Sequence, residues 1–208
     1  MTKARHHRIT TVMQQRQTDA CVLMEKVHKL HNLAAVIRTC DAVGVDQLHA
    51  VLADGEYRRH PHVASGANSW IHTHLHEDIT TAITELKAQG KTIYAAHLSD
   101  DAVDFKSVDY TKPCAILLGT EKFGISDEAA ELADQHIMIP MRGMVESLNV
   151  SVAAALILYE LERQRTEAGL YNKASYTPQD IERVAREKMH PRMVRHCKAN
   201  NIELPKLD

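Results

Sequence analysis

The sequence contains no long apolar run. Its longest apolar stretch, Val150 to Tyr159, is interrupted by Ser151 and has about half the length that a membrane-spanning helix needs. The first residues, MTKARHHRITT, contain no apolar core of the kind found in secretory signals. These two absences predict a protein that neither spans a membrane nor is exported.

Closely spaced cysteines are also missing. The four cysteines, Cys21, Cys40, Cys114 and Cys197, lie far apart, and neither CxxC nor CxxH occurs. Without a secretory signal, this usage indicates reduced thiols and a cytoplasmic location. Cys40 and Cys114 fall in apolar segments, and we interpret them as small core residues.

The common glycine-rich nucleotide motifs GxGxxG and GxxxxGK[ST] are absent as well, and there is no internal repeat. What is present is an average globular composition: 208 residues, of which 44% are hydrophobic and 25% charged. This length corresponds to roughly one to one and a half ordinary domains.

The formal net charge of −2 hides an uneven distribution. Residues 1–18 and 188–202 each contain four basic residues and no acidic one, so the stretch between them is net acidic. Basic ends on an acidic middle suggest a polyanionic partner such as a nucleic acid. Ordinary solvated helix faces are the alternative explanation.

Apolar segments of strand length alternate with helical patterns along the chain. Strands are predicted at residues 21–27, 47–53, 70–76, 92–98, 114–118 and 137–139. Helices are predicted at 32–43 before Gly44, from Asp78 or Thr80 to Gly90, at 126–133 and at 147–165. The alternation predicts an α/β fold with a mainly parallel sheet and helices on both faces.

The helix expected at 147–165 is apolar nearly all round in its first turns. We therefore expect the sheet to cover one side of it and a partner subunit the other. A further helix should start with Thr177 as N-cap and Pro178 at N1. The chain is thus divided into a basic N-terminal helical extension (1–18), an α/β domain (19–168) and a C-terminal helical extension (169–208).

Three segments carry polar residues in positions suited to chemistry. Arg38 interrupts an apolar helix that has Asn32 at its N-terminus, although an N-cap asparagine and a solvated arginine would look the same. A turn at 118–124 follows an apolar strand, where ligands gather in α/β sheets. Ser147 is expected to cap the long helix, with Asn149 in its first turn bonding either a ligand or a neighbouring loop.

Together these segments resemble the SpoU/TrmH family of SPOUT-class RNA ribose 2′-O-methyltransferases over nearly the whole chain. The first motif runs from Asn32 to Arg38 and on through TCDAVGV, the second is ILLGTEKFGIS (116–126), and the third is IPMRGMVESLNVSVAAALILYE (139–160). SGANSW (65–70), AAHLSDDAVDF (95–105) and the C-terminal helices are most similar to tRNA guanosine-18 2′-O-methyltransferases. The resemblance implies transfer of a methyl group from S-adenosylmethionine to a tRNA ribose.

The same resemblance implies a C-terminal trefoil knot in the sheet and a homodimer with its sites at the subunit interface. It places S-adenosylmethionine on residues in three loops: His97, Leu98, Gly119, Ile139, Met144 and Leu148. It gives the catalytic role to Arg38, with Asn32, Glu121, Ser147 and Asn149 orienting it or shaping the site. No metal is required, because the sulfonium itself provides the leaving group.

The basic ends then become candidate tRNA phosphate contacts: Arg8, Arg16, Arg192, Arg195 and Lys198. His72, His74 and His76 share one strand face, a spacing compatible with a metal, but we interpret them as a polar strand face. Tyr57–His60 could contact RNA or be solvated. An rRNA 2′-O-methyltransferase of the same superfamily and a catalytically silent RNA-binding dimer remain the alternative functions.

Overall fold

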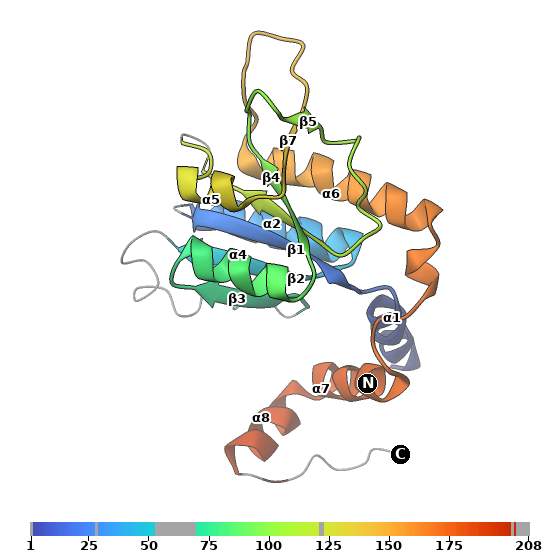
Figure 1. Cartoon of the computed structure of the whole chain (residues 1–208). Helices are drawn as coiled ribbons and strands as arrows, with labels where there is room; N and C mark the ends of the chain where they lie inside the picture. The colour runs from blue at the N-terminus through green and yellow to red at the C-terminus, as the bar shows by residue number, and fades with distance from the viewer. Residues whose placement is uncertain (1, 28, 53–69, 121–122, 201, 203–208) are drawn as a thin grey trace. The chain divides into compact units, whose positions relative to one another are not determined.

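The computed structural model describes residues 2–27, 29–52, 70–120, 123–200 and 202, without the side chains of Val27 and Lys198. Glu121, Tyr57–His60 and most of the SGANSW segment therefore lie outside the described residues. The chain divides into two compact units, Gln17–Leu170 and Met1–Arg16 together with Tyr171–Asp208 (Figure 1). The two ends, which we treated as separate extensions, thus belong to one unit.

Within the described part of the larger unit, seven strands form one sheet in the order β3-β2-β1-β6-β4-β7-β5. The strands are β1 (Gln17–Val27), β2 (Val45–Leu52), β3 (His72–His76), β4 (Thr92–Ala96), β5 (Val103–Asp104), β6 (Cys114–Leu118) and β7 (Gln135–Met138). All neighbouring strands pair in parallel. The predicted parallel sheet is confirmed, and only the short edge strand β5 was not foreseen.

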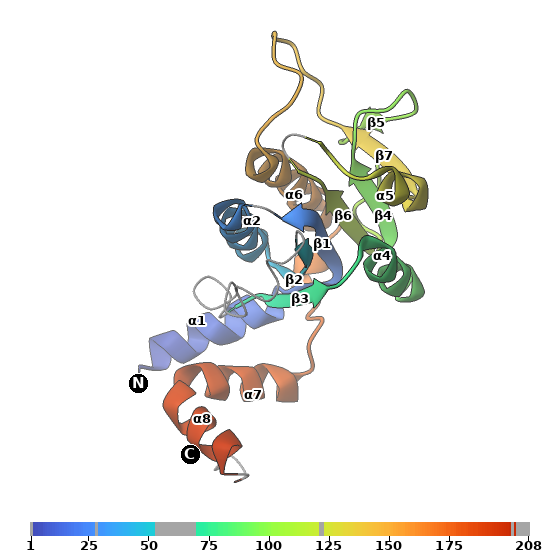
Figure 2. The ribbon, with the colours of Figure 1, turned by 90° about the vertical axis from the view of Figure 1, so that its left-hand side faces the viewer.

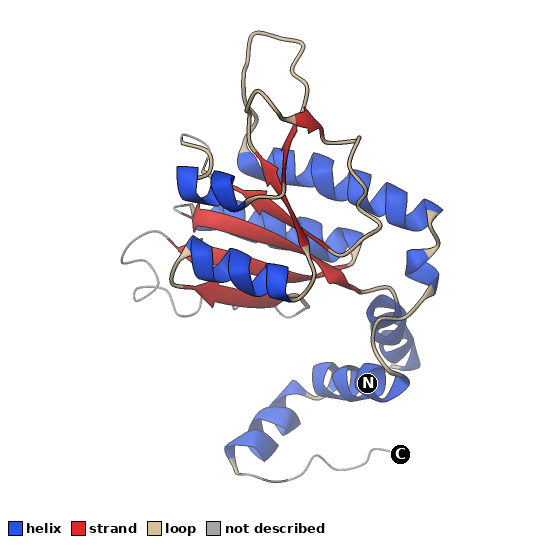
Figure 3. Ribbon diagram, viewed as in Figure 1, coloured by secondary structure: helices blue, strands red, loops and turns tan. Residues whose placement is uncertain are grey.

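Helices cover both faces of this sheet, as predicted. They are α2 (Leu30–Val43), α4 (Ile79–Ala88), α5 (Asp127–Leu132) and α6 (Val150–Glu167). Figure 2 shows α2 and α6 on one side of the strands and α4 and α5 on the other, and Figure 3 separates helices, strands and loops by colour. A hydrophobic core lies on each face of the sheet: in β6, Cys114 and Ile116 pack into the core beneath α2 and α6, and Ala115 and Leu117 into the core beneath α4 and α5, because strand side chains alternate between faces.

The helix ends follow local capping chemistry, with one correction. Gly44 ends α2 in the left-handed conformation (φ 79°), as predicted, and Asp78 caps α4 by accepting a hydrogen bond from the Thr81 N–H. The long helix α6 begins at Val150, however, and its N-cap is Asn149. The prediction that Ser147 caps this helix is wrong, because residues 139–149 form a loop (Figure 3).

The smaller unit is helical. It contains α1 (Lys3–Gln14), α7 (Pro178–Met189) and α8 (Pro191–Ala199), and a short 3-10 turn at Leu170–Asn172 leads into it. Helix α1 packs against α7, where His6 Nε2 lies 3.2 Å from a Glu182 carboxylate oxygen. Thr177 caps α7 as predicted. None of the described helices is both long and apolar enough to cross a bilayer.

The direction of the strand order reverses at β1. From β1 the sheet continues through β2 to β3 on one side and through β6, β4 and β7 on the other. In open α/β sheets ligands bind beyond the carboxyl ends of the strands at such a reversal. A ligand site is therefore expected at the loops that follow β1 and β6.

Candidate active site

The predicted site residues gather at one edge of the sheet. Strands β1, β6, β4 and β7 are adjacent and parallel, so their carboxyl ends lie along the same edge. Asn32 and Arg38 follow β1, His97 and Leu98 follow β4, Gly119 follows β6, and Ile139, Met144, Ser147, Leu148 and Asn149 follow β7. Segments far apart in sequence are thereby brought to the same edge, whereas Arg38 lies in the middle of α2, which runs back from this edge toward the start of β2.

A direct contact joins the first and third motifs. The side-chain N–H of Asn149 donates to Oδ1 of Asn32 at 3.4 Å, and Asn149 Oδ1 accepts from the Ser151 N–H at 2.8 Å. Asn32 is buried, and it lies inside the first turn of α2, whose N-cap is Lys29. Asn32 is therefore not an N-cap, and its amide faces another loop of the candidate site.

Arg38 lies on the exposed face of α2, on which His31 and Ala34 precede it. Within the described residues its side chain forms neither a hydrogen bond nor an ion pair. A guanidinium is always protonated and offers five N–H donors. The structure thus places a fixed positive charge, available to a ligand, two turns beyond Asn32.

The turn after β6 is closed by its own backbone. The Thr120 N–H donates to the Gly124 carbonyl at 2.8 Å, and the Gly124 N–H donates to the Thr120 carbonyl at 3.0 Å. A Cβ atom at Gly119 would lie 2.0 Å from the Gly124 carbonyl carbon, so no other residue fits there. Glu121, the acidic residue of this turn, is not among the described residues.

Glu25, which the sequence analysis did not single out, holds this turn from β1. Its buried carboxylate accepts the Ser126 N–H at 2.8 Å and lies 3.8 Å from the exposed Lys26 ammonium. Lys26 adopts a left-handed backbone (φ 49°), a conformation that is strained for a residue with a Cβ. The sequence feature that could have identified Glu25 is its position as an acidic residue near the end of the apolar run CVLMEKV.

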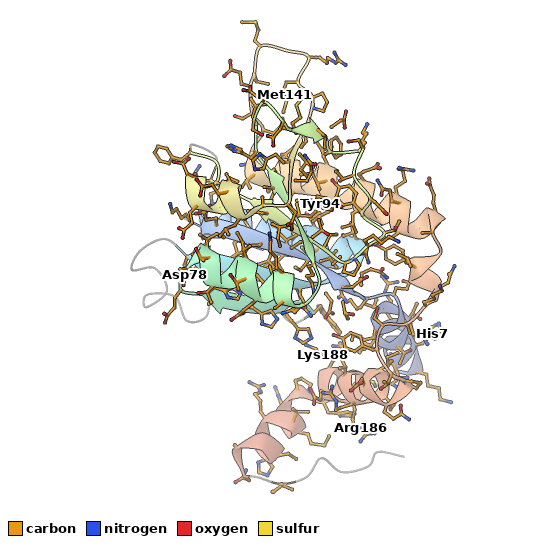
Figure 4. The ribbon with its side chains drawn as sticks, in the orientation of Figure 1. His7, Asp78, Tyr94, Met141, Arg186 and Lys188 are labelled. Carbon is orange, nitrogen blue, oxygen red and sulfur yellow. The ribbon has the colours of Figure 1, made fainter. Side chains whose placement is uncertain are left out.

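The loops after β4 and β7 differ in how they are anchored. The His97 N–H donates to the Ile137 carbonyl at 3.2 Å, while Leu98 is 70% exposed. Met144 is 98% exposed, and it lies with Met141 on a loop that projects beyond the sheet (Figure 4). Met144 and Ser147 are thus both exposed on this loop.

The predicted RNA contacts also differ in accessibility. Arg8 in α1 and Arg192 and Arg195 in α8 are exposed. Lys198 is in α8 as well. Arg16 is fully buried (0% exposed), so the structure does not offer it to a phosphate.

Two of the three histidines of β3, His74 and His76, stack with His49 of β2. The His49 ring lies 4.6 Å from the His74 ring and 5.1 Å from the His76 ring, with interplanar angles near 20°. His49 Nδ1 is 2.9 Å from His76 Nε2. Stacked rings do not converge on one point, and among the described residues no group of three or more could hold a metal ion.

Comparison with known proteins agrees with this arrangement. The model of the SpoU rRNA Methylase family matches residues 19–159, and the model of its C-terminal region matches residues 163–208. The chain belongs to the SpoU methylase family. This SpoU-family chain is 48% identical to the tRNA (guanosine(18)-2′-O)-methyltransferase of Escherichia coli K12 over 207 residues, which cover 99% of the chain and 90% of that protein.

Solved structures show the same fold. The A. aeolicus TrmH/SpoU tRNA modifying enzyme superposes with a TM-score of 0.81 at 37% identity, covering 91% of this chain and 97% of that one. An AdoMet-bound rRNA methyltransferase from Sinorhizobium meliloti gives a TM-score of 0.61 at 28% identity, covering 74% and 59%. The segments along this edge of the sheet are thus motifs of a methyltransferase family.

Proposed function

We propose that this chain transfers a methyl group from S-adenosylmethionine to the ribose 2′-hydroxyl of guanosine-18 in tRNA. The observation that carries the proposal is the 48% identity to a tRNA (guanosine(18)-2′-O)-methyltransferase over nearly the full length of both proteins. The meeting of Asn32 and Asn149 at the carboxyl edge of the sheet supports it. An rRNA substrate is the alternative, because the S. meliloti relative acts on rRNA by its name.

The residues at this edge fit the proposed methyl donor. Leu98, Phe123 and Met144 expose large apolar side chains on the loops after β4, β6 and β7. Exposed apolar groups of this kind are suited to cover a purine ring. S-adenosylmethionine, when bound, supplies a methyl group on a positively charged sulfur. We assign it to Leu98, His97, Gly119, Ile139, Met144 and Leu148.

In this proposal Arg38 binds the RNA phosphate beside the target ribose. Its guanidinium stabilises the negative charge that develops on the 2′-oxygen, an interaction that is strong in a desolvated site. Because a guanidinium does not give up its proton, Arg38 is not the base, and the hydroxyl proton leaves to phosphate or water. Asn32 fixes the beginning of the helix that carries Arg38.

In this proposal the loops around the Arg38 guanidinium are shaped by Asn149, Ser147 and Glu121. Asn149 joins the start of α6 to α2, as its contact with Asn32 indicates. Ser147 is exposed and available to RNA or to a second subunit. Glu121 is proposed to steady Arg38 or a neighbouring loop.

We further propose that the active protein is a homodimer. Val152, Leu156 and Tyr159 form an exposed apolar stripe along α6 at a spacing of about one turn, and exposed stripes of this kind favour a protein partner. A second subunit would also cover the projecting loop with Met144. We propose a trefoil knot in the same region, supported by β7 lying between the consecutive strands β4 and β5.

The methyl transfer is assigned to residues 19–168 and the outer tRNA contacts to the two ends. Duplex RNA is recognised through phosphates and 2′-hydroxyls, so the exposed Arg8, Arg192 and Arg195, with Lys198, are proposed to bind the tRNA backbone. Arg16 is left out of this surface because it is buried. The cytoplasmic location stays a prediction.

Modification mapping in a cell tests the substrate. An Escherichia coli strain without its own tRNA (guanosine(18)-2′-O)-methyltransferase would receive the chain, and 2′-O-methyl groups would then be mapped in both tRNA and rRNA. Restored methylation at guanosine-18 supports the proposal. Methylation confined to rRNA would favour the alternative substrate. If a calorimetric titration with S-adenosylmethionine detected no binding, a catalytically silent RNA-binding protein would be favoured instead.

A further inference from the structure

A second polar cluster lies at the same edge of the sheet, beside His97. Ser99 Oγ lies 2.7 Å from His136 Nδ1 and 2.6 Å from an Asp101 carboxylate oxygen, and His136 Nδ1 lies 3.2 Å from that same oxygen. Ser99 and Asp101 follow β4, and His136 belongs to β7. The cluster therefore joins the segment 97–101 to the neighbouring strand, and the mechanism above uses none of its three members.

The contacts limit which atoms of the cluster can carry the hydrogens. His136 Nε2 lies 3.1 Å from the Ala130 carbonyl oxygen, which can only accept, so Nε2 carries a hydrogen. In a neutral imidazole Nδ1 would then be bare. Ser99 has one hydroxyl hydrogen, which it could donate either to His136 Nδ1 or to the Asp101 carboxylate. Whichever of these two short contacts lacked the hydrogen would then place two lone pairs against each other.

Protonation of His136 removes this conflict. Nδ1–H then donates to Ser99 Oγ, the Ser99 hydroxyl donates to Asp101, and the imidazolium lies close to a carboxylate. Protonating Asp101 instead is disfavoured, because the hydrogen bonds from Ser99 and His136 hold the pKa of its carboxyl below its ordinary value. An imidazolium and a carboxylate would thus satisfy all of these contacts at once.

We propose that protonated His136 is a positioning residue that holds the segment 97–101 for binding of the methyl donor. This inference rests on the proposed function, which assigns His97 and Leu98 to the donor. His97 is linked to the same strand, because its N–H donates to the Ile137 carbonyl and its ring meets the His136 ring edge to face at 5.2 Å. Among the described residues, the titratable groups that face His136 are Asp101 and His97, while α5 contributes the Ala130 carbonyl.

A pH dependence follows from this arrangement. When His136 loses its Nδ1 hydrogen as the pH rises, one contact that holds Ser99 is lost and the segment with Leu98 loosens. The affinity for S-adenosylmethionine should therefore decrease as the pH rises. By linkage, binding of S-adenosylmethionine should draw a proton onto the protein.

Calorimetric titration of the full chain with S-adenosylmethionine tests this inference. Histidine side chains titrate between about pH 5 and pH 8, so the comparison uses about pH 6 and about pH 8.5. The wild type should bind about tenfold more weakly at the higher pH, the loss expected for a charge-assisted hydrogen bond. Titrations in buffers of different ionisation enthalpy should show proton uptake on binding near neutral pH.

Two variants identify the group responsible. His136→Asn places an amide that donates near the Nδ1 position at every pH, so its affinity should be the same at both pH values and its proton uptake should disappear. Ser99→Ala removes the link while changing a single atom, and it should bind weakly at both. Ser99→Ala keeps the inference testable if His136→Asn does not fold.

Equal wild-type affinity at both pH values would overturn the inference. So would an unchanged pH dependence in His136→Asn, which would assign the titration to another group such as His97. Unimpaired binding by Ser99→Ala at low pH would also contradict it. Absence of S-adenosylmethionine binding by the wild type at either pH would instead refute the proposed function.

Discussion

The side-chain amide of Asn149 donates to Oδ1 of Asn32 across 3.4 Å, joining the first turn of α2 to the start of α6. Asn149 also caps α6 through the Ser151 N–H. One residue thus has a stabilising role in its own helix and a second role toward the helix that carries Arg38. The two roles can be separated experimentally.

Asn149→Ala should lower the free energy of unfolding by about 1 kcal/mol, because an N-cap is lost, and it should also lower methyl transfer. Asn149→Ser retains a capping oxygen but is too short to reach Asn32. It should restore stability without restoring the rate of transfer. Urea unfolding and single-turnover kinetics measure the two quantities, and full recovery of the rate in Asn149→Ser would contradict a role for the Asn32 contact.

Arg38→Ala should nearly abolish methyl transfer while leaving S-adenosylmethionine affinity unchanged. The exposed side chain has no partner among the described residues, so the variant should unfold within about 0.5 kcal/mol of the wild type. Arg38→Lys is the matched control, because it retains the charge but not the planar fork that binds a phosphate. Near-normal transfer by Arg38→Ala would remove this residue from the chemistry.

Gly119→Ala should abolish binding of S-adenosylmethionine. The added Cβ would lie 2.0 Å from the Gly124 carbonyl carbon, so the turn after β6 would have to open. Gly143→Ala is the control, because a Cβ there meets no atom within 4 Å. Calorimetry compares the two variants, and wild-type binding by Gly119→Ala would show that this turn does not contribute to the donor site.

Salt should weaken tRNA binding strongly. If the exposed arginines of the two ends neutralise phosphates, raising the salt from 50 to 200 mM should reduce affinity on the order of a hundredfold or more. Arg192→Ala and Arg195→Ala should each reduce the slope of log affinity against log salt by about one. A flat salt response in filter binding would exclude these ends from the RNA interface.

Acid should destabilise the fold through His49. Burial, and then the neighbouring His74 and His76, lower the pKa of His49 from about 6.5 to about 3. Below pH 6.5 the unfolded chain takes up a proton that the folded chain excludes, so the free energy of unfolding falls as the pH falls toward 3. For this one group the slope is at most about 1.4 kcal/mol per pH unit.

His49→Asn should reduce that slope, measured by urea unfolding between pH 7 and pH 4. His7→Asn provides the control, because His7 is exposed on α1 (Figure 4) and its replacement should leave the slope unchanged. An identical slope in wild type and His49→Asn would show that acid sensitivity arises elsewhere.

Local patterns predicted much of the fold. The bounds of β6, the left-handed Gly44 and the Ser126 and Thr177 caps follow from chemistry within a few residues. The start of α6 could not be predicted from local chemistry, because Ser147 and Asn149 are both residue types that cap helices well. The contact of Asn149 with Asn32 comes from another part of the chain and is invisible in the local sequence.

The sequence predicted which segments contribute to the site but not which of their residues contact one another. The two-residue strand β5 exists through pairing with β7, so no pattern of its own marks it. Glu25 and His136 were missed because their importance depends on the Ser126 N–H and on Ser99, far away in sequence. Burial of Arg16 is likewise a tertiary property that a basic segment does not reveal.

Methyl transfer to an unmodified tRNA transcript, with the modified nucleotide located by nuclease digestion and mass spectrometry, tests the central claim most directly. The account predicts one 2′-O-methyl group per tRNA, at guanosine-18, made by the wild type and not by Arg38→Ala. A methyl group on a base, at another ribose, or formed equally well by Arg38→Ala would contradict it.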